Sequence, residues 1–155
     1  MHRITTVLLL VLTIVSLIAT GCGKSVPKGS STEVKAIVLQ IADGYYLDQL
    51  AGACYQQVSG IPIALVGMKV DYAWLRDNAD TDGSAMKALK ALDGVKAKMN
   101  LSLQNVRTEE VDKEIGRTRY SCEIVFGKNI DKVSFTAQCN EAGRLYVEVF
   151  GLGDD

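Results

Sequence analysis

Histidine is almost missing from this chain of 155 residues: the only one, His2, lies in an N-terminal segment that we expect to be removed. A mature chain without histidine excludes Ser-His-Asp and Cys-His catalysis, the HExxH zinc helix and histidine-ligated metal sites. The sequence also lacks a Walker glycine loop, a dinucleotide-binding fingerprint and a nucleophile elbow.

The chain also has no strong excess of positive or negative charge. Once residues 1–21 are removed, sixteen Lys and Arg face eighteen Asp and Glu, a net charge of −2. This balance gives no electrostatic footprint for nucleic acid. The acids of the first half, Asp43, Asp48, Asp71 and Asp77, are not paired at a spacing typical of general acid and base catalysis. We therefore expect no nucleic acid, metal or cofactor, and a protein that is not an enzyme.

The N-terminal segment has the order of a targeting signal. Arg3 is followed by an apolar run from Ile4 to Ala19 and then by Ala19-Thr20-Gly21-Cys22. A charged region, an apolar region and small residues at a cleavage site are typical of a secretory signal peptide. The run is shorter than the roughly 20 apolar residues that span a bilayer. A transmembrane anchor and ordinary secretion are the alternatives.

A cysteine placed directly after the small residues resembles the lipobox of bacterial lipoproteins. The resemblance implies cleavage before Cys22, a diacylglyceryl thioether on its sulfur and usually a further acyl chain, such as palmitate, on its new amino group. It implies a cell-envelope protein that is held to the membrane by acylated Cys22. Residue Gly23 is not aspartate, which in an enteric-type, Gram-negative cell favours the outer membrane, facing the periplasm.

The rest of the chain has the length of one small domain. Residues 1–21 are the expected signal, and residues 22–31 are the lipidated cysteine and a tether of small and polar residues, which we expect to be flexible. Residues 32–151 form the domain, and residues 152–155 an acidic tail.

Helical periodicity dominates the first half of the domain. A first helix is predicted from Thr32 to about Val58, with Ser31 or Thr32 as N-cap and with Gly44 as a position where it can kink. Its apolar residues continue past Gly44 with a small drift. Residues 61–67 are ambiguous between a strand and the start of a second helix over 68–78, and a third helix is predicted over 84–99.

From Asn100 the apolar period changes to two: Tyr120, Cys122 and Ile124 share one face of a strand, and Arg119 and Glu123 share the other. Strands are predicted over 101–106, 118–127, 133–140 and 145–149, with a tight turn over 140–143. Helices followed by a meander predict an α+β fold, with N-terminal helices packed on a C-terminal four-stranded antiparallel sheet. We expect the apolar face of the sheet to pack against the first and third helices.

This order of elements, over Thr32 to Gly151, resembles small envelope lipoproteins with the ketosteroid-isomerase-like (nuclear-transport-factor-like) cone. The closing residues RLYVEVFG resemble the last strand of uncharacterised bacterial lipoproteins. A cystatin-like sheet around one helix is the alternative fold. The catalytic carboxylates of the isomerases have no counterpart here, so the resemblance implies no activity.

Three cysteines remain beside Cys22. If Phe126 faces Phe135 across the hairpin, Cys122 faces Cys139, at a distance that permits a disulfide. Such a bridge is compatible with a compartment outside the cytoplasm. The alternatives are two buried thiols, or a bridge from Cys54 to either cysteine.

Two aromatic residues of the last strand, Tyr146 and Phe150, alternate away from its apolar face and form a candidate interaction patch. The alternative is that the tail or the helical half covers them. A second aromatic group near the helices either lines a cleft for a small apolar ligand or is core: Tyr45, Tyr46, Tyr55, Tyr72 and Trp74.

The stretch from Asn78 to Gly83 resembles the start of a calcium loop, but its twelfth position is Leu89 instead of glutamate. The mismatch favours a turn in which Asp82 or Ser84 caps the third helix.

The leading hypothesis from the sequence is a lipid-anchored, non-enzymatic module that binds another envelope protein. A carrier or sensor with an apolar pocket between sheet and helices is the second hypothesis. An enzyme that uses buried carboxylates is the third.

Overall fold

The computed structural model describes residues 26–63, 67 and 69–153. Within these residues, three helices precede a four-stranded antiparallel meander of order β1-β2-β3-β4. The predicted α+β class is confirmed. The elements are α1 (Thr32–Ser59), α3 (Tyr72–Asn78), α4 (Gly83–Lys96), β1 (Leu101–Asp112), β2 (Arg117–Phe126), β3 (Asn129–Cys139) and β4 (Leu145–Phe150).

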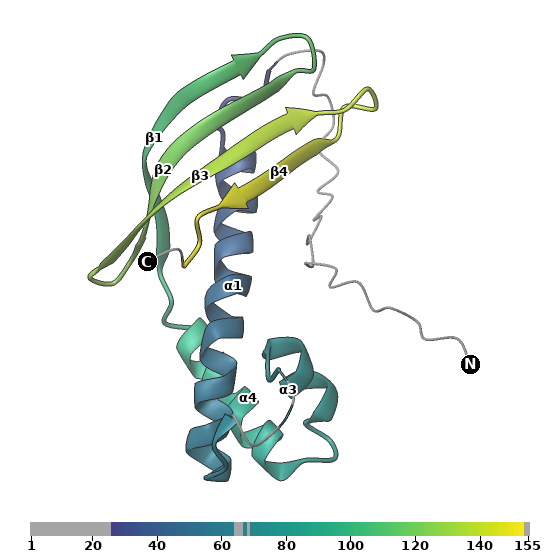
Figure 1. The fold of residues 1–155 in the computed structure, drawn as a ribbon, viewed down its shortest axis with the longest axis vertical. Coiled ribbons are helices and arrows are strands. Elements are labelled where there is room, and N and C mark those ends of the chain that lie inside the picture. Colours follow the sequence, from purple (N-terminus) through teal and green to yellow (C-terminus); the bar gives the residue numbers. More distant parts are fainter. Residues whose placement is uncertain (1–25, 64–66, 68, 154–155) are drawn as a thin grey trace.

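Helix α1 runs along the whole molecule (Figure 1). Its 28 residues span about 42 Å at 1.5 Å per residue. The Ser31 hydroxyl accepts from the backbone N–H of Val34, and Gly60 ends the helix in the left-handed conformation, with φ 71°. The helix continues through Gly44, which stays exposed, because packing on either side outweighs a glycine cost of about 1 kcal/mol.

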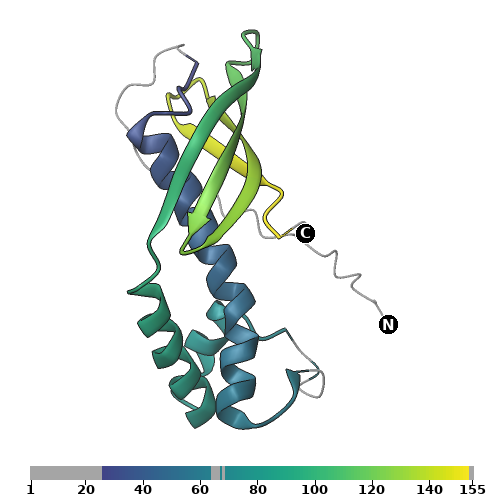
Figure 2. The ribbon, with the colours of Figure 1, turned by 90° about the vertical axis from the view of Figure 1, so that its left-hand side faces the viewer.

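The two halves of α1 bury different faces. Val38 lies in the core beneath the sheet, whereas Ala51 packs against α3 and α4. At 100° per residue these positions lie about 140° apart around the helix axis. The apolar pattern therefore steps around the helix instead of drifting slightly as predicted, since the sheet and the other helices lie on different sides of α1 (Figure 2).

Two separate cores follow from this step. The first core lies between the N-terminal half of α1 and the sheet, and Phe135 and Ile124 are fully buried there. The second core joins the C-terminal half of α1 to α3 and α4 around Leu75 and Leu92. The third helix was predicted to pack on the sheet. That prediction is wrong, because the buried residues of α4 all belong to the second core.

The register of the β2–β3 hairpin removes the predicted disulfide. Phe126 faces Asn129 across a two-residue turn, so Cys122 faces Val133 and Cys139 lies beyond the end of this pairing, opposite Leu145. Cys122 is a buried free thiol. The predicted Cys122–Cys139 bridge is therefore wrong: it assumed a longer turn, whereas Gly127 with φ 61° permits a tight one.

The boundaries of other elements differ from their predictions. Helix α3 begins at Tyr72 because the side chain of Asp71 caps it, and β1 extends to Asp112 instead of ending at 106. Asp82 caps α4, as the turn interpretation predicted. Among the described residues, no helix is both long enough and apolar enough to cross a bilayer.

The segment before α1 is held against the sheet. The hydroxyl of Tyr120 donates to the carbonyl oxygen of Pro27, and the Tyr120 ring lies against Gly29, where a Cβ would come within 2.6 Å of it. Pro27 and Gly29 are buried. The tether predicted to be flexible up to Ser31 is therefore fixed from Pro27 onward. The expected signal peptide and Cys22 lie outside the described residues.

Candidate functional site

The face of the sheet that points away from α1 carries most of the charged side chains of the strands. Alternation along β2 and β3 turns Arg119, Glu123 and Lys132 to this outer face, while Tyr120 and Phe135 point into the core. In β4 the outward residues are Tyr146, Glu148 and Phe150; the inward ones pack against the first core.

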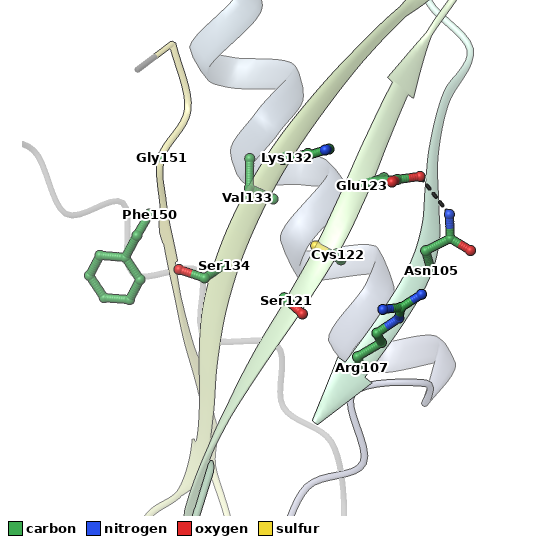
Figure 3. Close-up of a pocket in the computed structure, with 10 residues that line it drawn as sticks. All are labelled: Asn105, Arg107, Ser121, Cys122, Glu123, Lys132, Val133, Ser134, Phe150 and Gly151. Atoms are coloured by element: carbon green, nitrogen blue, oxygen red, sulfur yellow. Dashed lines mark hydrogen bonds between the residues drawn. The ribbon is translucent and has the colours of Figure 1, made fainter. Parts of the chain in front are cut away.

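A hollow of about 700 Å³ lies on this outer face (Figure 3). Across its floor one row of register partners runs from Arg107 through Ser121 and Ser134 to Phe150. The charged side chains that line it are Arg107, Lys132 and Glu123, so the hollow has one positive charge in excess.

A second hollow, of about 240 Å³, shares the Phe150 side chain. Its floor is the neighbouring row, in which Glu110 faces Arg119, Arg119 faces Thr136, and Thr136 faces Glu148. Three acids and two arginines line it: Glu110, Asp112, Glu148, Arg117 and Arg119. The second hollow therefore has one negative charge in excess. Phe150, 44% exposed, therefore separates two hollows of opposite net charge.

A bulge in β1 shapes the first hollow. The register shifts between Gln104 and Arg107, and Asn105 adopts φ 52°, a left-handed conformation that asparagine tolerates better than most residues. The Asn105 amide then donates to a carboxylate oxygen of Glu123 at 2.5 Å. The bulge thus places the Asn105 amide against Glu123, whose register partner on β3 is Lys132.

The C-terminal residues do not cover the outer face as far as the structure describes them. Gly151 still lines the first hollow, but Leu152 packs against the first core and Gly153 lies beside the Tyr45 hydroxyl, so the chain crosses to the α1 side of the sheet after Gly151. Helices α3 and α4 lie beyond the end of the sheet (Figure 1). Within the described ranges, neither covering element considered for Tyr146 and Phe150 reaches them.

The structure separates the two residues of the predicted patch. Tyr146 faces Gln138, two positions along β4 from Glu148, and its hydroxyl accepts from the Asn140 amide at 3.3 Å. It does not line either of the two hollows. Phe150 lines both, and is therefore the aromatic centre of the surface.

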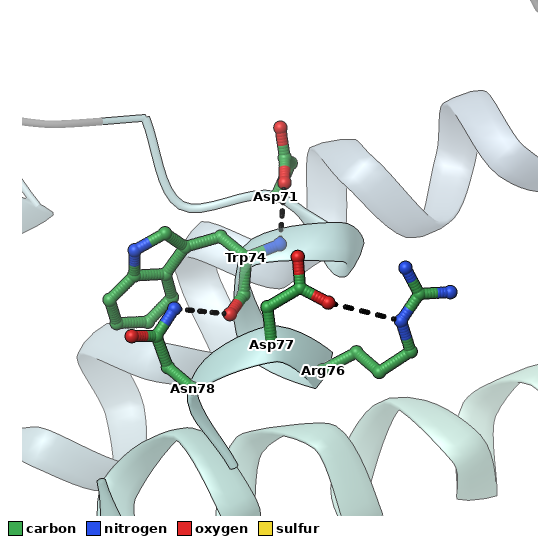
Figure 4. A network of polar contacts seen from close by, with 5 residues as sticks. All are labelled: Asp71, Trp74, Arg76, Asp77 and Asn78. Atoms are coloured by element: carbon green, nitrogen blue, oxygen red, sulfur yellow. Dashed lines mark hydrogen bonds and ion pairs between the residues drawn. The ribbon is translucent and has the colours of Figure 1, made fainter. Parts of the chain in front are cut away.

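The carboxylates of the helical end have structural partners. Asp48 accepts from the backbone N–H of Tyr72 at 3.0 Å, and Asp43 lies 3.8 Å from the ammonium group of Lys96. Asp71 accepts from the Trp74 N–H at 2.9 Å, and Asp77 lies 3.4 Å from the Arg76 guanidinium (Figure 4). Asp43, Asp48 and Asp71 therefore fix helix ends and helix contacts, whereas Asp77 forms only an exposed ion pair with its neighbour in the chain.

Aromatic residues near the helices divide between the two cores. Tyr46 stacks on Phe126, with ring centroids 5.9 Å apart, and also donates to Asp131. Tyr55 meets Trp74 edge to face at 5.2 Å. Burial and the hydrogen bond to Asp93 raise the pKa of Tyr72. These side chains are packing residues rather than the lining of one cleft.

Metal-ligating chemistry finds little support in the described part of the chain. It contains no cluster of three or more His, Cys, Asp or Glu side chains arranged to hold a metal. Asp82, the second acid of the calcium-like stretch, uses Oδ1 to accept from the N–H groups of Ser84 and Ala85. The Asn78 amide donates to the carbonyl of Trp74.

Comparison of the chain with protein-family models, curated proteins and solved structures finds no match in any of the three. The outer face of the sheet is therefore interpreted from its own geometry.

Sequence reasoning found Phe150 but missed the residues around it. The alternation along β2 already turned Arg119 and Glu123 outward. Arg107 was missed because the predicted first strand ended at 106, whereas β1 continues to Asp112. Asn105 lay inside the predicted strand, but the apolar pattern does not show the bulge there.

Proposed function

We propose that this chain is a lipid-anchored, non-enzymatic module of the cell envelope that binds a partner protein through the outer face of its sheet. The observation that carries the proposal is the position of Phe150, a half-exposed aromatic side chain between two hollows of opposite charge. Aromatic residues are enriched at the centres of protein interfaces, with polar side chains around them.

The charges around Phe150 define the partner that this face fits. An acidic group of the partner would face Arg107 and Lys132, and a basic group would face Glu110 and Glu148. An apolar side chain would cover the Phe150 ring between them. Because the charged side chains are exposed, they contribute more to orientation and association rate than to affinity.

The tight packing beneath the sheet favours a binding surface on the outside of the protein over a carrier pocket inside it. Beneath the sheet, Val38, Ile124 and Phe135 have no exposed surface, and Tyr120 stacks on Phe135 with ring centroids 4.9 Å apart. Both hollows described above open outward. The face that a ligand or partner reaches is therefore the polar one.

Site-specific photocrosslinking tests the proposal. A photoreactive phenylalanine replaces Phe150 in cells that produce the lipidated chain, and the matched control replaces Met86 on α4, which is 42% exposed. We expect a discrete protein adduct from position 150 that is absent from position 86. Lys132→Glu should weaken the adduct, since it changes the net charge of the first hollow from +1 to −1. Equal adducts at both positions, or none at 150, would contradict the proposal.

A further inference from the structure

The described chain begins at the end of the sheet where β1 turns into β2. Pro27 accepts from the Tyr120 hydroxyl, and Gly29 lies under the Tyr120 ring. Tyr120 lies on β2 only five residues after Ile115, which belongs to the β1–β2 turn. Both views of the fold place the start of α1 and this turn at the same end of the molecule (Figures 1 and 2).

Only a short length of chain separates this end from the proposed lipid. From Cys22 to Val26 there are four peptide steps, which extend to about 14 Å at most. The next residue, Pro27, is fixed on the sheet. If acyl chains on Cys22 lie in a bilayer, the turn end of the sheet is held close to the lipid headgroups. This step rests on the lipid anchor of the proposed function.

The β1–β2 turn presents apolar side chains at that end. Val111 is 45% exposed and Ile115 is 47% exposed. The Asp112 carboxylate accepts from the backbone N–H groups of Glu114 and Ile115 at 3.0 and 3.3 Å. The turn is therefore ordered by its own hydrogen bonds, with Ile115 left outward.

We propose that the β1–β2 turn, residues 111–117, is a second membrane contact, in which Val111 and Ile115 enter the headgroup region beside the lipid anchor. Apolar side chains with basic residues nearby are favoured at this depth of a bilayer. Lys113 and Arg117 lie two residues to either side of Ile115, and the acids Asp112 and Glu114 balance their charge, so the contact depends on the apolar side chains. Two contacts orient the domain where one tether would not. Helix α1 then points away from the membrane, and α3 and α4 lie at the end of the molecule that is farthest from it.

Tryptophan quenching by brominated lipid tests this contact. The only native tryptophan, Trp74, lies in the helical end and serves as an internal reference. Ile115→Trp adds an indole at the turn, and Ile130→Trp adds one at the opposite end of the sheet, where Ile130 is 57% exposed. The lipidated full chain is reconstituted into phosphatidylethanolamine and phosphatidylglycerol vesicles with and without brominated acyl chains.

We expect brominated vesicles to remove most of the emission added by Ile115→Trp and to leave the Ile130→Trp and wild-type emission unchanged. Quenching that is equal for both variants, or absent from Ile115→Trp in a chain whose Cys22 mass shows the acyl groups, would overturn the second contact and leave the anchor standing. A Cys22 without acyl groups would overturn both. Circular dichroism of each variant verifies that the sheet is intact.

Discussion

The Tyr55 hydroxyl donates a hydrogen bond to Oδ2 of Asp82 at 2.9 Å, while Oδ1 of the same carboxylate caps α4. One side chain thus joins the end of α1 to the start of α4. The hydrogen bond from Tyr55, followed by those from the Ser84 and Ala85 N–H groups, lowers the pKa of Asp82. The same contact raises the pKa of Tyr55.

This contact predicts acid sensitivity of the helical end. Since the pKa of Asp82 is lower in the folded chain than in the unfolded chain, its stabilisation is complete above the unfolded value and is lost as the pH falls through the folded one. Asp82→Asn keeps a capping oxygen but removes the charge, so we expect a smaller loss of unfolding free energy between about pH 5 and pH 2.

Urea unfolding across that pH range measures the effect. The matched control is Asp80→Asn, which alters an exposed acid of the same turn. A pH dependence reduced equally by both substitutions would show that Asp82 is not its source.

Two glycines of the N-terminal region predict opposite effects on stability. Gly29→Ala places a methyl group within 2.6 Å of the Tyr120 ring, so we expect it to destabilise the chain by about 1–3 kcal/mol. Gly44→Ala meets no atom within 4 Å and lies within α1, so it should stabilise by about 0.5–1 kcal/mol. Chemical unfolding distinguishes these signs. A neutral Gly29→Ala would indicate that the segment before α1 does not stay on the sheet.

The thiol of Cys122 is predicted to be inert in the folded chain. Burial, with a smaller effect of Glu123, raises its pKa to about 11 from a usual 9.0, which lowers the thiolate fraction near neutral pH roughly a hundredfold. We expect no alkylation by iodoacetamide before unfolding and full alkylation in urea. Rapid native alkylation would contradict the burial of Cys122, and a peptide map that joins Cys122 to Cys139 would contradict the hairpin register.

Substituting two phenylalanines on opposite faces of the sheet should affect stability and partner binding separately. Phe135→Ala empties a fully buried position and should cost about 3–5 kcal/mol of unfolding free energy. Phe150→Ala alters the outer face and should change stability by less than about 0.5 kcal/mol, while it removes partner binding. Thermal unfolding together with the crosslinking assay measures both. A large loss of stability in Phe150→Ala would identify Phe150 as a packing residue.

Much of the fold follows from local patterns. The alternation of Tyr120, Cys122 and Ile124 gave the inward face of β2, and Asp82 before an apolar helix gave the start of α4. Such features depend on neighbouring residues, whose period and capping chemistry the sequence displays directly.

Features that depend on distant partners were not predictable. Val38 and Ala51 share one helix, and only the positions of the sheet and of α4 show that they bury different faces. The register that separates Cys122 from Cys139 depends on the length of a turn. The bulge at Asn105, which shapes the first hollow, follows from pairing with β2 and not from the residues of β1 alone.

The mass of the mature N-terminus tests the central claim most directly, since both the envelope function and the membrane contact depend on the lipid at Cys22. Chain purified from membranes should give an N-terminal peptide that begins at Cys22 and carries the added mass of a diacylglyceryl group, with or without a further acyl chain. Cys22→Ser should release the chain from the membrane fraction or leave the precursor uncleaved. An unmodified Cys22 peptide, or one that still begins at Met1, would contradict the account.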